Sequence, residues 1–157
     1  MKGREGHKIV AQNRKARHDF FIEERHEAGL VLQGTEVKAL REGRANLKDG
    51  FARIKDGEMF LEDVHISPYA YGNQFNHEPV RSRKLLLNRS EINRLTGKVK
   101  ERGYTLIPLT LYFARGRAKV ELALARGKKL HDKRETLRRK ELEKEIERSY
   151  TYKGRRI

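Results

Sequence analysis

The sequence predicts a mainly β domain followed by a basic C-terminal tail. Segments rich in β-forming residues recur at short spacing in the first four fifths of the chain, and two of them meet at Asp56-Gly57, a dipeptide typical of tight hairpins. Two amphipathic stretches between these segments predict helices. From Arg126 to Ile157, 13 Lys and Arg stand against 6 Asp and Glu, with too few apolar residues to form a core.

The predicted strands number about six. Residues 18–33 predict one long, bent strand with a bulge at Gly29. Pro108 cannot donate a ladder hydrogen bond, so its strand is expected at an edge or with a bulge. The segments that contain the strands are 18–33, 50–66 (two strands), 81–88, and 104–127 (two strands around the turn at 115–117).

Two helices are expected, with a third one doubtful. The first begins at Thr35 as N-cap and ends at Gly43. The second begins at Ser90 as N-cap and ends at Gly103, with apolar residues at helical spacing between them. Residues 67–80 contain two prolines and predict a loop with at most one helical turn.

Short strands linked by hairpins and interrupted by helices are typical of a small closed barrel. We expect an OB-like antiparallel β-barrel with two to three peripheral helices. The composition changes near Gly127, so the expected domains are an OB-like barrel at 1–126 and a basic tail at 127–157. Residues 1–17 are polar and basic, and we expect them to be mobile.

The charge of the chain restricts its partners. A net charge of +15 and a pI near 10.2 favour nucleic acid or an anionic membrane. No apolar run has the roughly 18 residues that span a bilayer, and no secretory segment is evident. The tail scatters its few apolar residues among charges, unlike a membrane-surface helix. Nucleic acid is therefore the favoured partner, and the lack of Cys fits a reducing cytosol.

Patterns for catalysis, cofactors or metals are lacking in the sequence. The six His form no HExxH motif and no close pair at ligand spacing, and the Gly-rich motifs of phosphate-binding loops do not occur. Acidic pairs are frequent in a chain that is 38% charged and therefore indicate little. We predict a protein that is not an enzyme and has neither a cofactor nor a metal.

Two segments of the predicted barrel are candidates for binding. Arg81, Arg83 and Lys84 precede an apolar run, which suits either a strand that contacts phosphates or a core strand with charged ends. Glu36 is one acidic residue in a basic helix. It is either an ordinary solvated or ion-paired residue or a carboxylate that accepts hydrogen bonds from RNA bases or ribose.

Three segments resemble the SmpB family, the SsrA-binding proteins of bacteria. They are EAGLVLQGTEVKALREGRANLKD, RSRKLLLNRSEI and ARGKKLHDKRE, in this order, and the resemblance runs from about Asn13 to Glu135. Beyond Glu135 only the basic character of the tail is similar. The resemblance implies an OB-like barrel that binds the tRNA-like end of transfer-messenger RNA (tmRNA, SsrA RNA) in the cytoplasm. It also implies delivery of tmRNA to ribosomes that are stalled on messages without a stop codon, the process called trans-translation.

The resemblance also implies which residues act. tmRNA binding would belong to Glu36, Leu86 and Asn88 on one exposed surface, so that Glu36→Ala or Asn88→Ala weakens binding without loss of stability. The tail would be disordered alone and would become helical in the decoding centre and empty mRNA channel of the ribosome. GTP hydrolysis would belong to elongation factor Tu and peptidyl transfer to the ribosome. The residues implied in ribosome binding are Gly127, Lys128, Lys129, His131, Asp132, Lys133 and Arg134.

Two other classes share some of these features. A structural protein embedded in the ribosome would have a similar size, charge and basic tail. A nuclease or RNA-modifying enzyme would share the charge but would need an acid–base or metal set, which the sequence does not offer.

Overall fold

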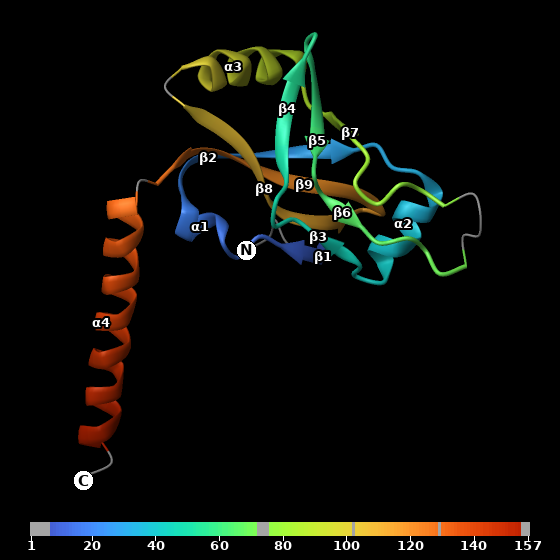
Figure 1. Cartoon of the computed structure of the whole chain (residues 1–157). Helices are drawn as coiled ribbons and strands as arrows, with labels where there is room; N and C mark the ends of the chain where they lie inside the picture. Colours follow the sequence, from blue (N-terminus) through green and yellow to red (C-terminus); the bar gives the residue numbers. More distant parts are fainter. Residues whose placement is uncertain (1–6, 72–75, 102, 129, 155–157) are drawn as a thin grey trace. The chain divides into compact units, whose positions relative to one another are not determined.

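The computed structural model describes residues 7–71, 76–101, 103–128 and 130–154. The chain divides into two compact units, residues 1–127 and residues 128–157. The first unit is built on an antiparallel sheet of seven strands (Figure 1). These strands are β1 (His7–Gln12), β2 (Phe20–Leu30), β4 (Phe51–Lys55), β5 (Glu58–Glu62), β7 (Arg83–Leu86), β8 (Tyr104–Ala114) and β9 (Arg117–Gly127).

Six strands of this sheet close into a ring. Their order is β8-β4-β5-β7-β2-β9, and β9 pairs again with β8, while β1 pairs with β8 outside the ring. A separate pair of two-residue strands consists of β3 (Ala45–Asn46) and β6 (His65–Ile66). The prediction of a mainly β, OB-like barrel of about six strands is confirmed.

Two tight turns fix the hairpins of the ring. At the β4–β5 turn, Asp56 and Gly57 have φ angles of 52° and 76°, and at the β8–β9 turn Arg115 and Gly116 have 52° and 75°. Positive φ at both central residues defines a type I′ turn, whose twist matches that of the flanking strands. Both predicted hairpins are therefore present.

The described part of the sheet has three irregularities, of which one was expected and two, in β1 between Ile9 and Ala11 and in β2, were not. The ladder between β8 and β9 shifts between Pro108 and Thr110, as predicted for a proline within a strand. The predicted bulge at Gly29 is wrong, because the shift in β2 lies between Ile22 and Glu24. Gly29 is paired on both sides, and a Cβ there would lie 3.3 Å from Cβ of Leu86, so the position needs a small residue.

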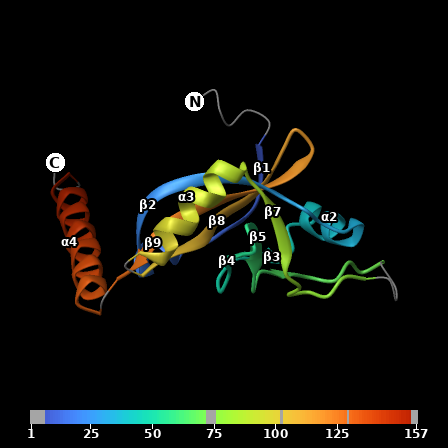
Figure 2. The ribbon, with the colours of Figure 1, turned by 90° about the horizontal axis from the view of Figure 1, so that it is seen from above.

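Two helices complete the core of the barrel. Helix α2 (Gly34–Arg41) and helix α3 (Arg89–Lys100) each bury two apolar residues in the main core. Figure 2 shows α3 beside the strands of the ring, where it contacts β8. Both helices begin earlier than predicted: the N-caps are Gln33 and Asn88, not Thr35 and Ser90. The described part of residues 67–80 contains no helix.

The prediction for residues 1–17 is wrong for its described part. Residues 7–12 form β1, which pairs with the second half of β8, and residues 16–19 form the short helix α1 (Ala16–Asp19). Ala16 is buried in a small second core on the outer side of β8 and β9. That second core explains why both strands have consecutive buried residues rather than strict alternation.

The second unit is the helix α4 (Leu130–Gly154). Its described apolar side chains, Leu137, Leu142 and Ile146, are each about half exposed. The helix therefore has little apolar surface to bury and no core of its own. No described helix is long and apolar enough to cross a membrane.

Two glycine substitutions test the packing of the barrel in opposite directions. In Gly50→Ala the new Cβ would lie 2.5 Å from Cγ2 of Val64 and 3.0 Å from Cγ of Pro108, so we expect a destabilisation of about 1–3 kcal/mol. In Gly97→Ala the new methyl has no neighbour within 4 Å and lies inside α3, so we expect a gain of up to about 1 kcal/mol. Urea unfolding measures both, and equal effects would contradict the packing described.

Candidate nucleic-acid interface

Glu36 lies at the start of α2 and is completely buried. The helix begins at Gln33 with a capping box, in which the Gln33 side chain accepts a hydrogen bond from the amide of Glu36. In return the Gln33 amide donates to Glu36 Oε1 at 2.8 Å. The capping box thus fixes the position of the Glu36 carboxylate at the N-terminus of α2.

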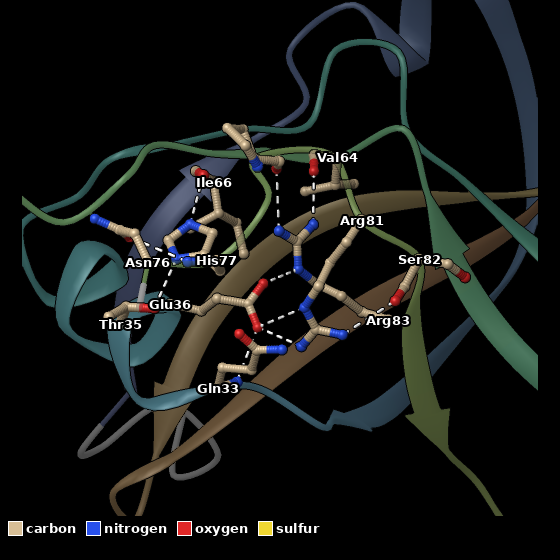
Figure 3. Close-up of polar contacts among 11 residues, drawn as sticks. Gln33, Thr35, Glu36, Val64, Ile66, Asn76, His77, Arg81, Ser82 and Arg83 are labelled. Atoms are coloured by element: carbon tan, nitrogen blue, oxygen red, sulfur yellow. Dashed lines mark hydrogen bonds and ion pairs between the residues drawn. The ribbon is translucent and has the colours of Figure 1, made fainter. Parts of the chain in front are cut away.

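Two arginines converge on this carboxylate (Figure 3). Arg81 donates from Nε to Glu36 Oε1 at 3.0 Å and also from Nη2 to the same oxygen. Arg83, which has no exposed surface, donates from Nε to Glu36 Oε2. The carboxylate therefore connects α2 to the segment that enters β7.

The remaining donors of Arg83 are satisfied by backbone carbonyls. Its Nη1 donates to Val64 O at 2.7 Å and its Nη2 to Pro79 O at 3.0 Å. No buried side-chain nitrogen or oxygen of the described residues lacks a hydrogen-bond partner. A buried charge pair of this kind is tolerated only when every donor is matched, because desolvation of both ions is costly.

The pair keeps Glu36 ionised. Burial alone raises the pKa of Glu36, but the hydrogen bonds from Arg81, the Gln33 amide and Arg83 outweigh it and hold the pKa below its usual range. Burial lowers the pKa of Arg83, and the hydrogen bond to Glu36 opposes this effect. Of the two interpretations that the sequence allows for Glu36, the structure gives the intramolecular ion pair.

His77 joins the same region and was not singled out by the sequence. Its Nε2 lies 2.8 Å from Ile66 O and its Nδ1 lies 2.9 Å from Thr35 Oγ1. Nε2 therefore donates to the carbonyl, and Nδ1 accepts from the Thr35 hydroxyl. Asn76 binds both backbone polar groups of Tyr69, at 3.1 Å and 2.6 Å. The ends of the loop between β6 and β7 are thus fastened to α2 and to each other.

The side chains of β7 alternate between the core and the surface. Arg83 and Leu85 are buried, whereas Lys84 and Leu86 are exposed, Leu86 to 53%. Lys84 lies 3.2 Å from the carboxylate of Glu58 in an exposed ion pair. Asn88 is also exposed, and its side chain makes no capping hydrogen bond at the start of α3.

Lys84, Leu86 and Asn88 thus form one exposed strip, which we call the β7 surface. The expectation that Glu36 shares an exposed surface with Leu86 and Asn88 is wrong, because the carboxylate is held inside by its arginines. Acidic residues are rarely buried unless paired, and sequence gives no sign of a pairing across 45 or 47 positions.

The residues predicted to contact the ribosome lie where the first unit ends and the second begins along the chain. Gly127 ends β9 opposite Phe20, and Lys128 follows it. Lys129 lies outside the described residues. His131, Asp132 and Lys133 belong to the backbone of α4, and their side chains are likewise outside the description. Arg134 is exposed.

Comparison with known proteins identifies the family of this chain. The chain matches a solved chain described as "tmRNA-SmpB: a journey to the center of the bacterial ribosome", with a TM-score of 0.67 and 52% identity, over 82% of this chain and 94% of that one. The SmpB protein family model matches residues 10–152. The chain belongs to the SmpB family.

Curated relatives agree over nearly the whole chain. The SsrA-binding protein of Desulforudis audaxviator is 64% identical over 93% of this chain and 95% of its own length. The SsrA-binding proteins of Geobacillus thermodenitrificans and Bacillus subtilis are 63% and 58% identical, each over 91% of this chain and 92% of theirs.

A matched pair of substitutions tests the buried ion pair. Glu36→Gln removes the charge between two arginines, one fully buried, and we expect a loss of about 3–5 kcal/mol in the free energy of unfolding. Glu58→Gln removes the exposed partner of Lys84 and should cost under about 1 kcal/mol. Chemical denaturation of both variants measures the difference, and a loss below about 1 kcal/mol for Glu36→Gln would show that the pair is not buried in solution.

Proposed function

We propose that this protein binds the tRNA-like end of tmRNA and delivers it to stalled ribosomes for trans-translation. The observation that carries the proposal is the 52% identity, over 82% of this chain, to the solved chain described as "tmRNA-SmpB: a journey to the center of the bacterial ribosome". The curated relatives, all named SsrA-binding proteins, support the same function. A net charge of +15 supplies the general attraction to RNA phosphates.

The proposal assigns the β7 surface to tmRNA. Lys84 offers a cation for a phosphate, Asn88 has an amide that no helix cap uses, and Leu86 offers an exposed apolar contact. The ion pairs of Glu36 with Arg81 and Arg83 act indirectly in this proposal, because they fix the position of the segment that leads into β7. Arg81 is the partly exposed member of this group. Substitutions at Glu36 would then weaken RNA binding through the shape of this segment.

The proposal assigns the tail to the ribosome. Gly127, Lys128, Lys129 and the segment 131–134 begin it, and α4 continues it. Ordering a free chain costs about 1–2 kcal/mol per residue in backbone entropy, and the scattered apolar residues of α4 offset little of this. In this proposal no core of the free protein holds the helix α4 in place, so the tail is disordered until the decoding centre and mRNA channel order it as a helix, where RNA phosphates face its basic residues.

The protein carries out no chemistry of its own in this proposal. It works in the cytoplasm without cofactor or metal, and elongation factor Tu, bound through the tmRNA complex, hydrolyses GTP. No group of three or more potential ligands among the described residues could hold a metal ion. The proteins that it resembles are named for RNA binding rather than for a reaction.

Substitution of two asparagines distinguishes an effect on RNA binding from an effect on stability. Asn88→Ala removes a polar contact to tmRNA, so we expect a loss of about 1–3 kcal/mol in binding with little change in melting temperature. Asn93→Ala, the same change at an exposed position of α3, should leave RNA binding unchanged and raise the melting temperature slightly, because Ala favours a helix more than Asn does. Filter binding to the tRNA-like fragment of tmRNA gives the affinities. Equal effects of the two substitutions would remove Asn88 from the RNA contact.

Removal of the tail distinguishes tmRNA binding from the rescue of stalled ribosomes. A chain that ends at Gly127 keeps the whole ring of strands, so we expect an unchanged fold and nearly unchanged tmRNA affinity. It should fail to support tagging of nascent chains on stalled ribosomes in a purified translation system. His131→Ala in the full chain is the milder variant and should reduce tagging while tmRNA binding persists. Normal tagging by the truncated chain would contradict the role of the tail.

A further inference from the structure

Gly29 is a glycine in a strand that is paired on both sides. It lies opposite Leu86 of β7 and Lys119 of β9. Glycine weakens the interior of a strand, and where it occurs there it often marks a bulge or the close approach of another group. The β2 ladder shifts elsewhere, between Ile22 and Glu24, and Gly29 does not have a positive φ. Neither a bulge nor the backbone conformation therefore requires a glycine at this position.

The group that approaches Gly29 is the side chain of Leu86. A Cβ at position 29 would lie 3.3 Å from Cβ, 3.6 Å from Cδ1 and 3.8 Å from Cγ of Leu86. The Cβ atoms of residues directly opposite each other in an antiparallel pair usually lie about 4.5–5.5 Å apart. The Leu86 side chain therefore leans over β2 instead of standing upright on the sheet, and it takes the space that a side chain at position 29 would need.

Leu86 nevertheless remains accessible, together with a second apolar residue. Its side chain is 53% exposed, and Val31, two residues after Gly29, is 45% exposed. The amide of Val31 donates to Lys84 O at 3.0 Å, so the pairing of the two strands continues to this point. Alternate residues of a strand share a face. Val31, Lys84 and Leu86 therefore lie on one outer face, which is low and apolar where Leu86 covers Gly29.

The chemistry of this face separates two kinds of RNA contact. Phosphate oxygens require a cation or an N–H donor, which Lys84 offers, whereas the carbon atoms of a ribose and the face of a base pack against apolar side chains. A leucine that stood upright would hold the RNA away from the strands. Leu86 in its observed position lets a nucleoside approach β2 and β7 closely while a neighbouring phosphate reaches Lys84.

We propose that Gly29 is a positioning residue for RNA binding: it lets Leu86 lie flat over β2, so that the apolar face of one nucleoside packs on Leu86. Gly29 acts through the Leu86 side chain and offers no group of its own. The inference rests on the proposed function for the identification of the RNA as tmRNA, whereas the orientation of Leu86 is a property of the free protein.

The first measurement follows the orientation of Leu86 in the free full-length protein. The ¹³C chemical shifts of the two leucine methyl groups depend on the side-chain rotamer. We expect Gly29→Ala to change them, because the new methyl group displaces Leu86. Gly97→Ala, which adds a methyl group with no neighbour within 4 Å, is the matched control and should leave them unchanged. Unchanged Leu86 signals in Gly29→Ala overturn the proposal.

The second measurement is a double-mutant cycle for the affinity of the folded variants for the tRNA-like fragment of tmRNA. Leu86→Ala removes the apolar contact, and we expect a loss of about tenfold, with about three- to tenfold for Gly29→Ala. The combined variant should bind no more weakly than Leu86→Ala, because Gly29 acts only through the side chain that is then missing. Additive losses, or an unchanged affinity of Gly29→Ala, overturn the proposal.

A further variant tests the orientation without a change at Gly29. Leu86→Ile keeps the number of carbon atoms and changes only where they lie, so we expect it to lose affinity as Gly29→Ala does. An affinity equal to that of the wild type overturns the proposal, also where Gly29→Ala proves too unstable to measure.

The salt dependence of binding distinguishes a nucleoside contact from a phosphate contact. None of these variants removes a phosphate contact, so the logarithmic slope against salt should equal that of the wild type, and a flatter slope overturns the proposal. Failure of the wild type to prefer the tmRNA fragment over an unrelated RNA of equal length contradicts the proposed function instead. The methyl signals of Leu86 in the free protein then decide whether Gly29 positions this side chain.

Discussion

The buried carboxylate of Glu36 is the interaction on which this side of the barrel depends. The carboxylate accepts hydrogen bonds from Arg81, Arg83 and the backbone amide of Gln33, the N-cap of α2. Arg83 also donates to the backbone carbonyls of Val64 and Pro79. Three segments that are distant in sequence, around Glu36, Val64 and residues 79–83, are thereby fixed to one another. Side chains of a strand point alternately to its two faces. Because Arg83 points into the core, Leu86 points to the surface, and Asn88 is exposed just beyond the end of β7.

This arrangement explains how an acidic residue can belong to an RNA-binding protein of high positive charge. A carboxylate exposed beside phosphates would repel them, whereas one that is neutralised by two arginines inside the fold leaves the surface basic. In the function proposed above, Glu36 would then affect RNA binding only through the position of the segment that leads into β7.

The features that the sequence predicts correctly are local ones. Asp56-Gly57 and Arg115-Gly116 determine their turns by backbone preference, and Pro108 marks its bulge because it has no amide hydrogen. The features that it misses depend on distant partners. Strand β1 is short and follows a polar, basic start of the chain, and its ladder with residues 110–114 makes it a strand. The burial of Glu36 depends on Arg81 and Arg83, which no periodicity connects with α2.

The most direct test follows the two key side chains during RNA binding. In the ¹⁵N-labelled full-length protein, the Nε–H signal of Arg83 reports on the buried ion pair and the side-chain amide of Asn88 reports on the β7 surface. On addition of the tRNA-like fragment of tmRNA, we expect the Asn88 signal to shift while the Arg83 signal stays unchanged and protected from solvent exchange. A shift or loss of the Arg83 signal with an unchanged Asn88 signal would show that the ion pair opens to meet the RNA, and would contradict this account.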